Sequence, residues 1–104
     1  MSTVKNILMI KLSEKEIYQK LENFPDWEYF ENALQTDFEF DSFKDCISAI
    51  NRIAFECEAL NHHPEWTNTY NILDIKLTTN QVNAVTELDF KLLEAIHKIV
   101  EVEE

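Results

Sequence analysis

The chain has 104 residues, a formal net charge of −11, and 45% hydrophobic and 12% aromatic residues. This length is that of one domain, and the hydrophobic fraction is sufficient for a folded core. The excess of acidic over basic residues, 20 against 9, argues against nucleic acid or an anionic membrane surface as a direct partner. The absence of glycine excludes phosphate-cradling glycine loops. Two cysteines without metal-ligand spacing indicate free thiols in a reducing, cytoplasmic compartment.

The N-terminal part of the chain predicts an arm and then a helix. Residues 1–11 are expected to form an N-terminal arm or a short extra strand, and residues 12–104 a single domain. Ser13 and Glu16 have the spacing of a capping box, which predicts a helix over about Glu14–Glu22.

The next segment predicts a β-hairpin. Its arms are Trp27–Glu31 and Leu34–Phe40, and the turn is expected at Asn32-Ala33. The second arm alternates in polarity, so one of its faces is expected to pack on the core. The residues of that face are Leu34, Thr36, Phe38 and Phe40.

A long central helix is predicted over about Phe43–Asn61, with Ser42 and Asp45 at its cap. Its apolar residues recur with the helical period over five turns. They are Phe43, Cys46, Ile47, Ile50, Ile53, Ala54, Cys57 and Leu60. Phe55 lies about 100° away from this stripe, which makes it a candidate contact for another subunit.

The C-terminal part predicts a strand over Tyr70–Thr79 and a helix that Thr86 and Asp89 cap and that ends near Val102. The strands alternate on one side only, and helices separate them. This order indicates an α+β domain with two layers and an antiparallel sheet.

Residues 58–66 contain a cluster of polar side chains that neither the helical period nor the two-residue strand period explains. Glu58 and His62 are four residues apart, so they share a helix face if the central helix reaches His62. The restricted geometry before proline holds His63 beyond that helix. Two imidazoles near a carboxylate and Trp66 are typical of an acid/base pocket for a flat, polar heterocycle. The alternative is a simple C-terminal cap, since histidine suits the negative end of the helix dipole.

Other candidate groups have simpler interpretations. A metal site is disfavoured, because adjacent histidines rarely coordinate one ion and no third His or Cys has ligand spacing. Cys57 belongs to the apolar stripe, which favours a buried thiol over a nucleophile. His97 lies on an amphipathic helix, where a structural or solvated role is expected. Helix capping is sufficient to explain Asp89.

Three spaced motifs occur together in the second half of the chain. They are Glu58-xxx-His62-His63-Pro64-Glu65-Trp66-xxx-Tyr70, Leu77-Thr78-Thr79 and Thr86-Glu87-Leu88-Asp89. In these motifs the sequence resembles the pterin-4a-carbinolamine dehydratase family. The resemblance covers about residues 12–100 and includes Trp27 and the spaced apolar residues of 34–43.

The resemblance implies helices packed on one face of a four-stranded antiparallel sheet. It implies a homodimer or homotetramer formed partly through the long central helix, which agrees with the position of Phe55. The implied reaction is loss of water from 4a-hydroxytetrahydropterin to give quinonoid dihydropterin, in pterin recycling and without a metal or cofactor.

The resemblance also implies roles for individual residues. His62 and His63 match the acid/base and pterin-contacting histidines, and Glu58 matches their supporting acid. The expected substrate-binding or framework positions are Trp27, Trp66, Asp89 and Asn80. Expelling a tertiary hydroxyl requires one proton delivered to it and one removed from a ring nitrogen. Imidazoles, with an unperturbed pKa of about 6.5, can do either near neutrality.

One position departs from the family pattern. The family usually has a third histidine just after the Leu-x-Thr strand end, where this chain has Asn80. An amide exchanges hydrogen bonds but carries no proton at neutral pH, so the change bears on turnover more than on fold or pterin binding. Two hypotheses follow: a cytoplasmic dehydratase that Asn80 slows, or a pterin-binding or protein-interaction member that has lost catalysis.

Overall fold

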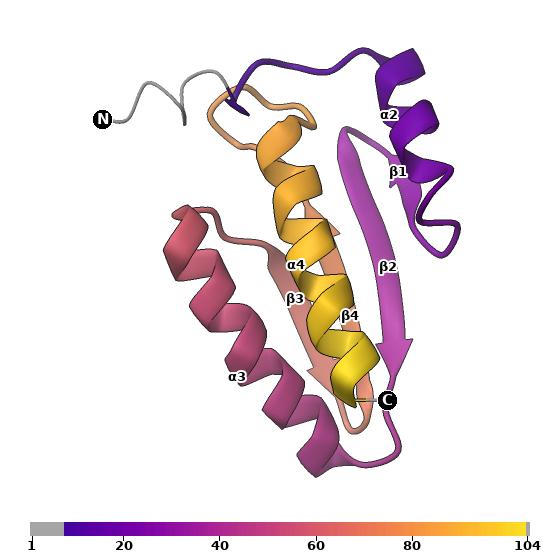
Figure 1. The fold of residues 1–104 in the computed structure, drawn as a ribbon, viewed down its shortest axis with the longest axis vertical. Coiled ribbons are helices and arrows are strands. Elements are labelled where there is room, and N and C mark those ends of the chain that lie inside the picture. The colour runs from indigo at the N-terminus through magenta and orange to yellow at the C-terminus, as the bar shows by residue number, and fades with distance from the viewer. Residues whose placement is uncertain (1–7, 104) are drawn as a thin grey trace.

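A four-stranded antiparallel sheet forms one layer of the computed structural model, which describes residues 8–103 (Figure 1). The strands lie in the order β1 (Glu28–Phe30), β2 (Ala33–Glu39), β4 (Ile72–Leu77) and β3 (Glu65–Thr69). The labelled helices are α2 (Glu14–Leu21), α3 (Phe43–Leu60) and α4 (Glu87–Glu103). Helices α3 and α4 lie side by side over one face of the sheet (Figure 1). The predicted two-layer α+β fold with a four-stranded antiparallel sheet is therefore confirmed.

The alternation of side chains along β2 and β4 decides which face of the sheet is packed. Leu34 lies opposite Leu77, and both side chains are buried beneath the helices. Asp37 lies opposite Asp74, and both are exposed on the other face. Successive side chains of a strand point to opposite faces, so the two-residue period predicted for this sheet is what separates its core face from its open face.

The first helix begins as predicted. The Ser13 hydroxyl accepts a hydrogen bond from the Glu16 amide at 3.1 Å, and the Glu16 carboxylate accepts one from the Ser13 amide at 3.0 Å. The hydrogen bond from the Ser13 amide to the Glu16 carboxylate, with a smaller contribution from the Ser13 hydroxyl, lowers the pKa of the Glu16 carboxyl. Just before the helix, Lys11 forms an isolated antiparallel bridge with Thr86. The arm or strand predicted for residues 1–11 falls mostly outside the described residues.

The hairpin turn lies one residue earlier than predicted. Glu31 and Asn32 have φ values of 49° and 63°, and they form the two-residue turn between β1 and β2. A tight hairpin turn of this kind requires positive φ at both central positions, which asparagine tolerates well. Ala33 instead pairs with Phe30 and is fully buried as the first residue of β2. The expected turn at Asn32-Ala33 is therefore wrong.

The predicted strand Tyr70–Thr79 is in fact the second half of a hairpin. Tyr70 has a φ of 52° and lies in the turn between β3 and β4, while β4 spans only Ile72–Leu77. The Asn68 amide group donates to the carbonyls of Tyr70 and Ile72, at 3.0 and 3.1 Å, and stabilises this turn. The sequence pattern missed β3, an edge strand whose one large apolar residue is Trp66.

Helix α3 has the predicted N-cap, in which the Ser42 hydroxyl accepts a hydrogen bond from the Asp45 amide at 3.1 Å. Its fully buried residues are Cys46, Ala49, Ile53 and Cys57. Phe43, expected on the buried stripe, is 50% exposed, because the packed stripe begins one turn after this first helical residue. Phe55 is 77% exposed, as its position off the stripe predicts.

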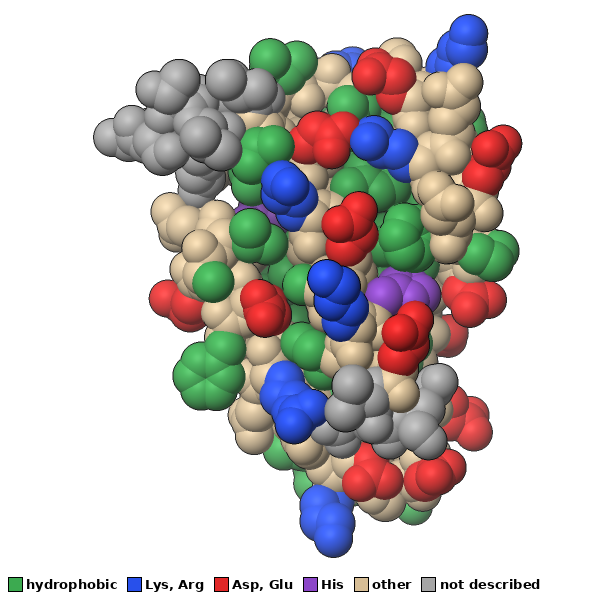
Figure 2. All heavy atoms as spheres, in the orientation of Figure 1, with side chains coloured by type: hydrophobic (Ala, Val, Ile, Leu, Met, Phe, Trp, Pro, Cys, Tyr) green, Lys and Arg blue, Asp and Glu red, His purple; other side chains and the backbone are tan. Residues whose placement is uncertain are grey.

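The helix-covered side of the molecule mixes acidic, basic and hydrophobic side chains (Figure 2). Beneath them, α4 contributes Leu92, Leu93 and Ile96 to the core, all with 0% exposure. None of the helices in the described part of the chain is long and apolar enough to cross a membrane.

Candidate active site

The chain reverses at the C-terminal end of α3 and directs the His62 side chain toward the protein interior. Asn61 adopts a left-handed conformation, with a φ of 50°, and ends the helix. The His62 amide then donates to the Cys57 carbonyl at 3.0 Å. This αL cap reverses the chain, which places the His62 imidazole, only 5% exposed, against the first turn of α4.

A buried network surrounds Asp89 at that point. His62 Nε2 lies 2.6 Å from Asp89 Oδ1. The other carboxylate oxygen, Oδ2, accepts hydrogen bonds from the Thr79 hydroxyl at 2.8 Å and the Thr86 amide at 2.9 Å. The Thr86 hydroxyl in turn accepts from the Leu88 amide at 3.2 Å. The predicted cap at Thr86 and Asp89 is therefore present, but Asp89 does more than cap α4 because it also binds His62.

Glu58 pairs with His63 rather than with His62. The distance from Glu58 Oε1 to His63 Nε2 is 2.8 Å, and both side chains are exposed, at 77% and 58%. Glu58 and His62 were expected to share a helix face only if the central helix reached His62, and this condition is not met because α3 ends at Leu60. The two neighbouring histidines therefore differ in environment. His62 is buried and contacts the buried Asp89 carboxylate, whereas His63 is exposed and contacts the exposed Glu58 carboxylate.

Asn80 directly follows the buried Thr79, just after the end of β4. Its side chain is exposed. Its backbone carbonyl accepts a hydrogen bond from the backbone amide of Asn83 at 3.2 Å. Asn83 has a φ of 50°, which closes this tight turn before Ala84 pairs back with Thr79. The position where the family resemblance predicts a third histidine is therefore one residue away from the Asp89 network along the chain.

The two tryptophans occupy other environments. Trp27 is 3% exposed, and its indole N–H donates to His97 Nε2 at 2.9 Å. His97 lies eight residues after Asp89, which is about 12 Å along α4, so Trp27 belongs to a separate aromatic cluster. The rings of this cluster are those of Phe24, Trp27, Phe38 and His97. Trp66 lies on β3 and packs partly buried against the core.

The structural role expected for His97 agrees with this contact. Its Nε2 accepts the indole hydrogen bond, and its ring packs against Phe24 with a centroid distance of 5.1 Å.

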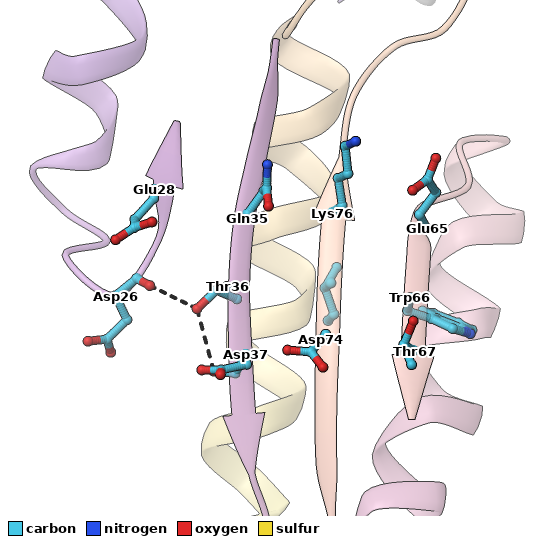
Figure 3. A pocket seen from close by; sticks show the side chains of 11 residues that line it. Asp26, Glu28, Gln35, Thr36, Asp37, Glu65, Trp66, Thr67, Asp74 and Lys76 are labelled. Atoms are coloured by element: carbon cyan, nitrogen blue, oxygen red, sulfur yellow. Dashed lines mark hydrogen bonds between the residues drawn. The ribbon is translucent and has the colours of Figure 1, made fainter. Parts of the chain in front are cut away.

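A hollow of about 620 Å³ on the open face of the sheet is a different feature. Its lining includes Asp37, Asp74 and Lys76 from the two central strands and Glu65 and Trp66 from β3 (Figure 3). None of the three described histidines contributes to it. The hollow is therefore not the acid/base site, although Trp66 borders it.

Other chemistries find little support among the described side chains. No group of three or more His, Cys, Asp or Glu residues whose side chains the structure describes is arranged to hold a metal ion. Cys46 and Cys57 are free and buried, and burial raises the pKa of the Cys57 thiol to about 11. A nucleophilic thiol requires the opposite shift, so Cys57 is a core residue.

Together, the fold and the site define a two-layer α+β protein with two adjacent histidines, each held by a carboxylate. The comparisons with known proteins give the family. The sequence profile of the pterin 4 alpha carbinolamine dehydratase family matches residues 10–99. The chain therefore belongs to this family.

Its relatives agree over nearly their whole length. A provisionally named pterin-4-alpha-carbinolamine dehydratase of Christiangramia forsetii is 49% identical over 94 residues, covering 90% of this chain and 97% of the relative. One of Chelativorans sp. is 44% identical and covers 79% of this chain and 86% of the relative.

Solved structures support the same fold. The crystal structure of a transcriptional coactivator/pterin dehydratase from Brucella melitensis has a TM-score of 0.84 at 34% identity, covering 86% of this chain and 98% of that one. A pterin dehydratase-like RuBisCO assembly factor of the alpha-carboxysome has a TM-score of 0.59 at 15% identity, covering 70% and 84%. At that identity the likeness concerns the fold alone.

Thr79 was named only as part of a motif, and neither its contact with Asp89 nor its contact with Thr86 was predicted. Both hydroxyls are fully buried and lie 2.7 Å apart. A signal was available, because threonine is a polar residue at an inward-facing position after Ile75 and Leu77, and buried polar groups are nearly always hydrogen-bonded.

Proposed function

We propose that the protein is a hydro-lyase that dehydrates 4a-hydroxytetrahydropterin to quinonoid dihydropterin, by acid/base catalysis with His62 and His63. The observation that carries the proposal is the pair of adjacent imidazoles, each within 2.8 Å of a carboxylate, at the family's motif. The proposed substrate is a small-molecule pterin, and the proposed setting is pterin recycling in the cytoplasm.

The reaction consists of one bond cleavage and two proton transfers. A proton goes to the 4a-hydroxyl, the C4a–O bond breaks and water leaves. The electron pair of N5 then forms the C4a=N5 bond as the N5 proton is removed. Each positioned proton transfer is worth about 10²–10⁴-fold in rate.

The exposures of the two histidines suggest how the work is divided. His63 is exposed and has Glu58 as its partner, so it is the imidazole that reaches a bound substrate most easily and exchanges protons with water. His62 is anchored on Asp89 and presents only a small part of its ring. The contact of Glu58 Oε1 with His63 Nε2 orients that ring.

Asn80, Trp27, Trp66 and Asp89 were predicted as substrate-binding or framework positions. We assign framework roles to Asp89 and Trp27, supported by the contact of Asp89 with His62 and the contact of Trp27 with His97. We propose that Asn80 and Trp66, which are more exposed, contribute to pterin contact by hydrogen bonding and packing.

A second candidate function is favoured by one specific position. Asn80 lacks the proton-carrying group of the third histidine, and the Brucella melitensis neighbour at 34% identity is named as a transcriptional coactivator as well as a pterin dehydratase. In this alternative the chain is a pterin-binding or protein-interaction member with weak or no catalysis.

The test is the dehydration rate of 4a-hydroxytetrahydropterin with the wild type and His63→Ala. The proposal predicts a wild-type rate above the spontaneous rate and a loss of at least tenfold in the variant. Lys98→Ala, a change of an exposed residue on α4, is the matched control and is expected to leave the rate unchanged. An unchanged rate in His63→Ala contradicts the assigned role, and pterin binding without any wild-type catalysis favours the second candidate.

A further inference from the structure

The buried polar side chains of the described residues form one connected group. They are His62, Thr79, Thr86 and Asp89, with exposures of 5%, 0%, 0% and 0%. No buried side-chain nitrogen or oxygen among the described residues lacks a hydrogen-bond partner. The two threonines come from different elements, one from the end of β4 and one from the cap of α4, so the fold brings them together for this network.

The direction of each hydrogen bond follows from the chemistry of its groups. An ionised carboxylate only accepts, so the single hydroxyl hydrogen of Thr79 points to Asp89 Oδ2. Thr79 then has only its lone pairs to offer Thr86, so the Thr86 hydroxyl donates across the 2.7 Å contact. Thr86 itself accepts from the Leu88 amide. The donors thus form a single chain that ends on Asp89.

This chain also determines the orientation of the carboxylate. Oδ2 of Asp89 accepts from Thr79 and from the Thr86 amide, which leaves Oδ1 for His62. The carboxylate cannot rotate without breaking two hydrogen bonds that burial makes costly to lose. Since ionised Oδ1 only accepts, His62 Nε2 must be the donor across 2.6 Å.

We infer that the Thr79–Thr86 hydroxyl pair fixes the Nε2–H tautomer of His62, with Thr79 as a positioning residue for the proposed acid/base chemistry. In that tautomer Nδ1 is the ring nitrogen left to accept a proton. This inference rests on the proposed function for its catalytic meaning, but its structural content, the tautomer, is independent of any activity.

His97 is an internal reference for the tautomer of His62. His97 is also a ring with a defined partner, but its Nε2 accepts the indole hydrogen of Trp27. The neutral ring of His97 therefore carries its hydrogen on Nδ1. The two rings are expected to show opposite tautomers in one spectrum.

The first experiment is ¹⁵N NMR of the histidine side chains in the wild type, assigned with His63→Ala and His97→Phe. The expected result is a protonated Nε2 in His62 and, in neutral His97, a protonated Nδ1. An unprotonated Nε2 in His62 overturns the inference, and this outcome requires neither a variant of Thr79 nor an active enzyme.

The second experiment removes the Thr79 hydroxyl at nearly constant volume. Thr79→Val is expected to introduce the second tautomer of His62. We expect kcat to fall about tenfold with KM within about twofold, which is the low end of the loss seen when a partner that fixes the tautomer of a metal-bound histidine is removed. Thr79→Ser retains the hydroxyl and is expected to restore both the spectrum and the rate. Thr78→Val is the matched control, because the Thr78 hydroxyl donates to the Asn32 carbonyl, outside the network.

These outcomes separate the inference from the proposed function. An unchanged His62 spectrum in folded Thr79→Val overturns the positioning role, even if stability falls. A wild type without dehydratase activity but with the expected tautomer and its loss in Thr79→Val contradicts the proposed function alone. If Thr79→Val does not fold, the wild-type spectrum alone still tests the tautomer, and an unprotonated Nε2 in His62 still overturns the inference.

Discussion

Asp89→Asn isolates the charge of the buried carboxylate that organises the candidate site. The substitution keeps the size and shape of the side chain but converts an acceptor of three hydrogen bonds into a neutral amide. A hydrogen bond to a charged group contributes about 1 kcal/mol more than a neutral one. Three such bonds predict a loss of about 3 kcal/mol in the free energy of unfolding.

Urea unfolding followed by far-UV circular dichroism measures this loss. For a domain of this size, a decrease of about 3 kcal/mol corresponds to a midpoint lower by about 1–3 M urea. Glu58→Gln is the matched control, because it makes the same chemical change and the same change in net charge at a carboxylate bound to the other histidine. With that side chain 77% exposed, the expected cost is at most about 0.5 kcal/mol.

The comparison has a clear negative result. Equal midpoints for the wild type and Asp89→Asn would show that the buried carboxylate does not stabilise the loop–helix junction, and the network derived from its three short contacts would be refuted.

Three further predictions concern parts of the fold away from Asp89. His97→Phe leaves the buried indole N–H of Trp27 without its acceptor, and we expect a loss of about 1–3 kcal/mol in urea unfolding; an unchanged midpoint would contradict the importance of this bond. Because burial raises the pKa of the Cys57 thiol to about 11, we expect no reaction with a thiol reagent at pH 8 until urea unfolds the chain, whereas rapid labelling of the native state would refute it. The same shift gives a contribution to stability that is present below the ordinary thiol pKa near 9 and is lost as the pH rises through 11. Light scattering at micromolar concentration is expected to give a homodimer or homotetramer that Phe55→Asp weakens; a monomeric wild type would refute self-association.

The fold was largely predictable because its main elements repeat simple patterns. The stripe of α3, the alternation of β2 and the caps at Ser13, Ser42 and Thr86 each depend on neighbours a few residues away. Strand β3 escaped prediction because Trp66 is its one large apolar residue, so its sequence shows no apolar–polar alternation, although the exposure of its residues alternates in the fold. The turn at Glu31-Asn32 was displaced by one residue because the burial of Ala33 is a property of the whole sheet.

The candidate site was predictable in its residue types but not in its pairing. The histidine motif was identified, yet the partner of each ring depends on where α3 ends. Asn61 adopts a left-handed conformation, so α3 ends at Leu60. The helix would have to continue for two more residues for His62 to share a face with Glu58. The contacts of Thr79 and Asp89 connect residues that are distant in sequence, and no local period contains that information.

The most direct test of the central claim is the rate of 4a-hydroxytetrahydropterin dehydration, compared between the wild type and Asn80→His. The proposed function predicts a wild-type rate well above the spontaneous one, with His62, His63 and Glu58 sufficient for proton transfer and at most a moderate gain in Asn80→His. A wild-type rate equal to the spontaneous one would contradict the proposal. Rescue by Asn80→His would then identify a pterin-binding protein whose catalysis was lost at one residue.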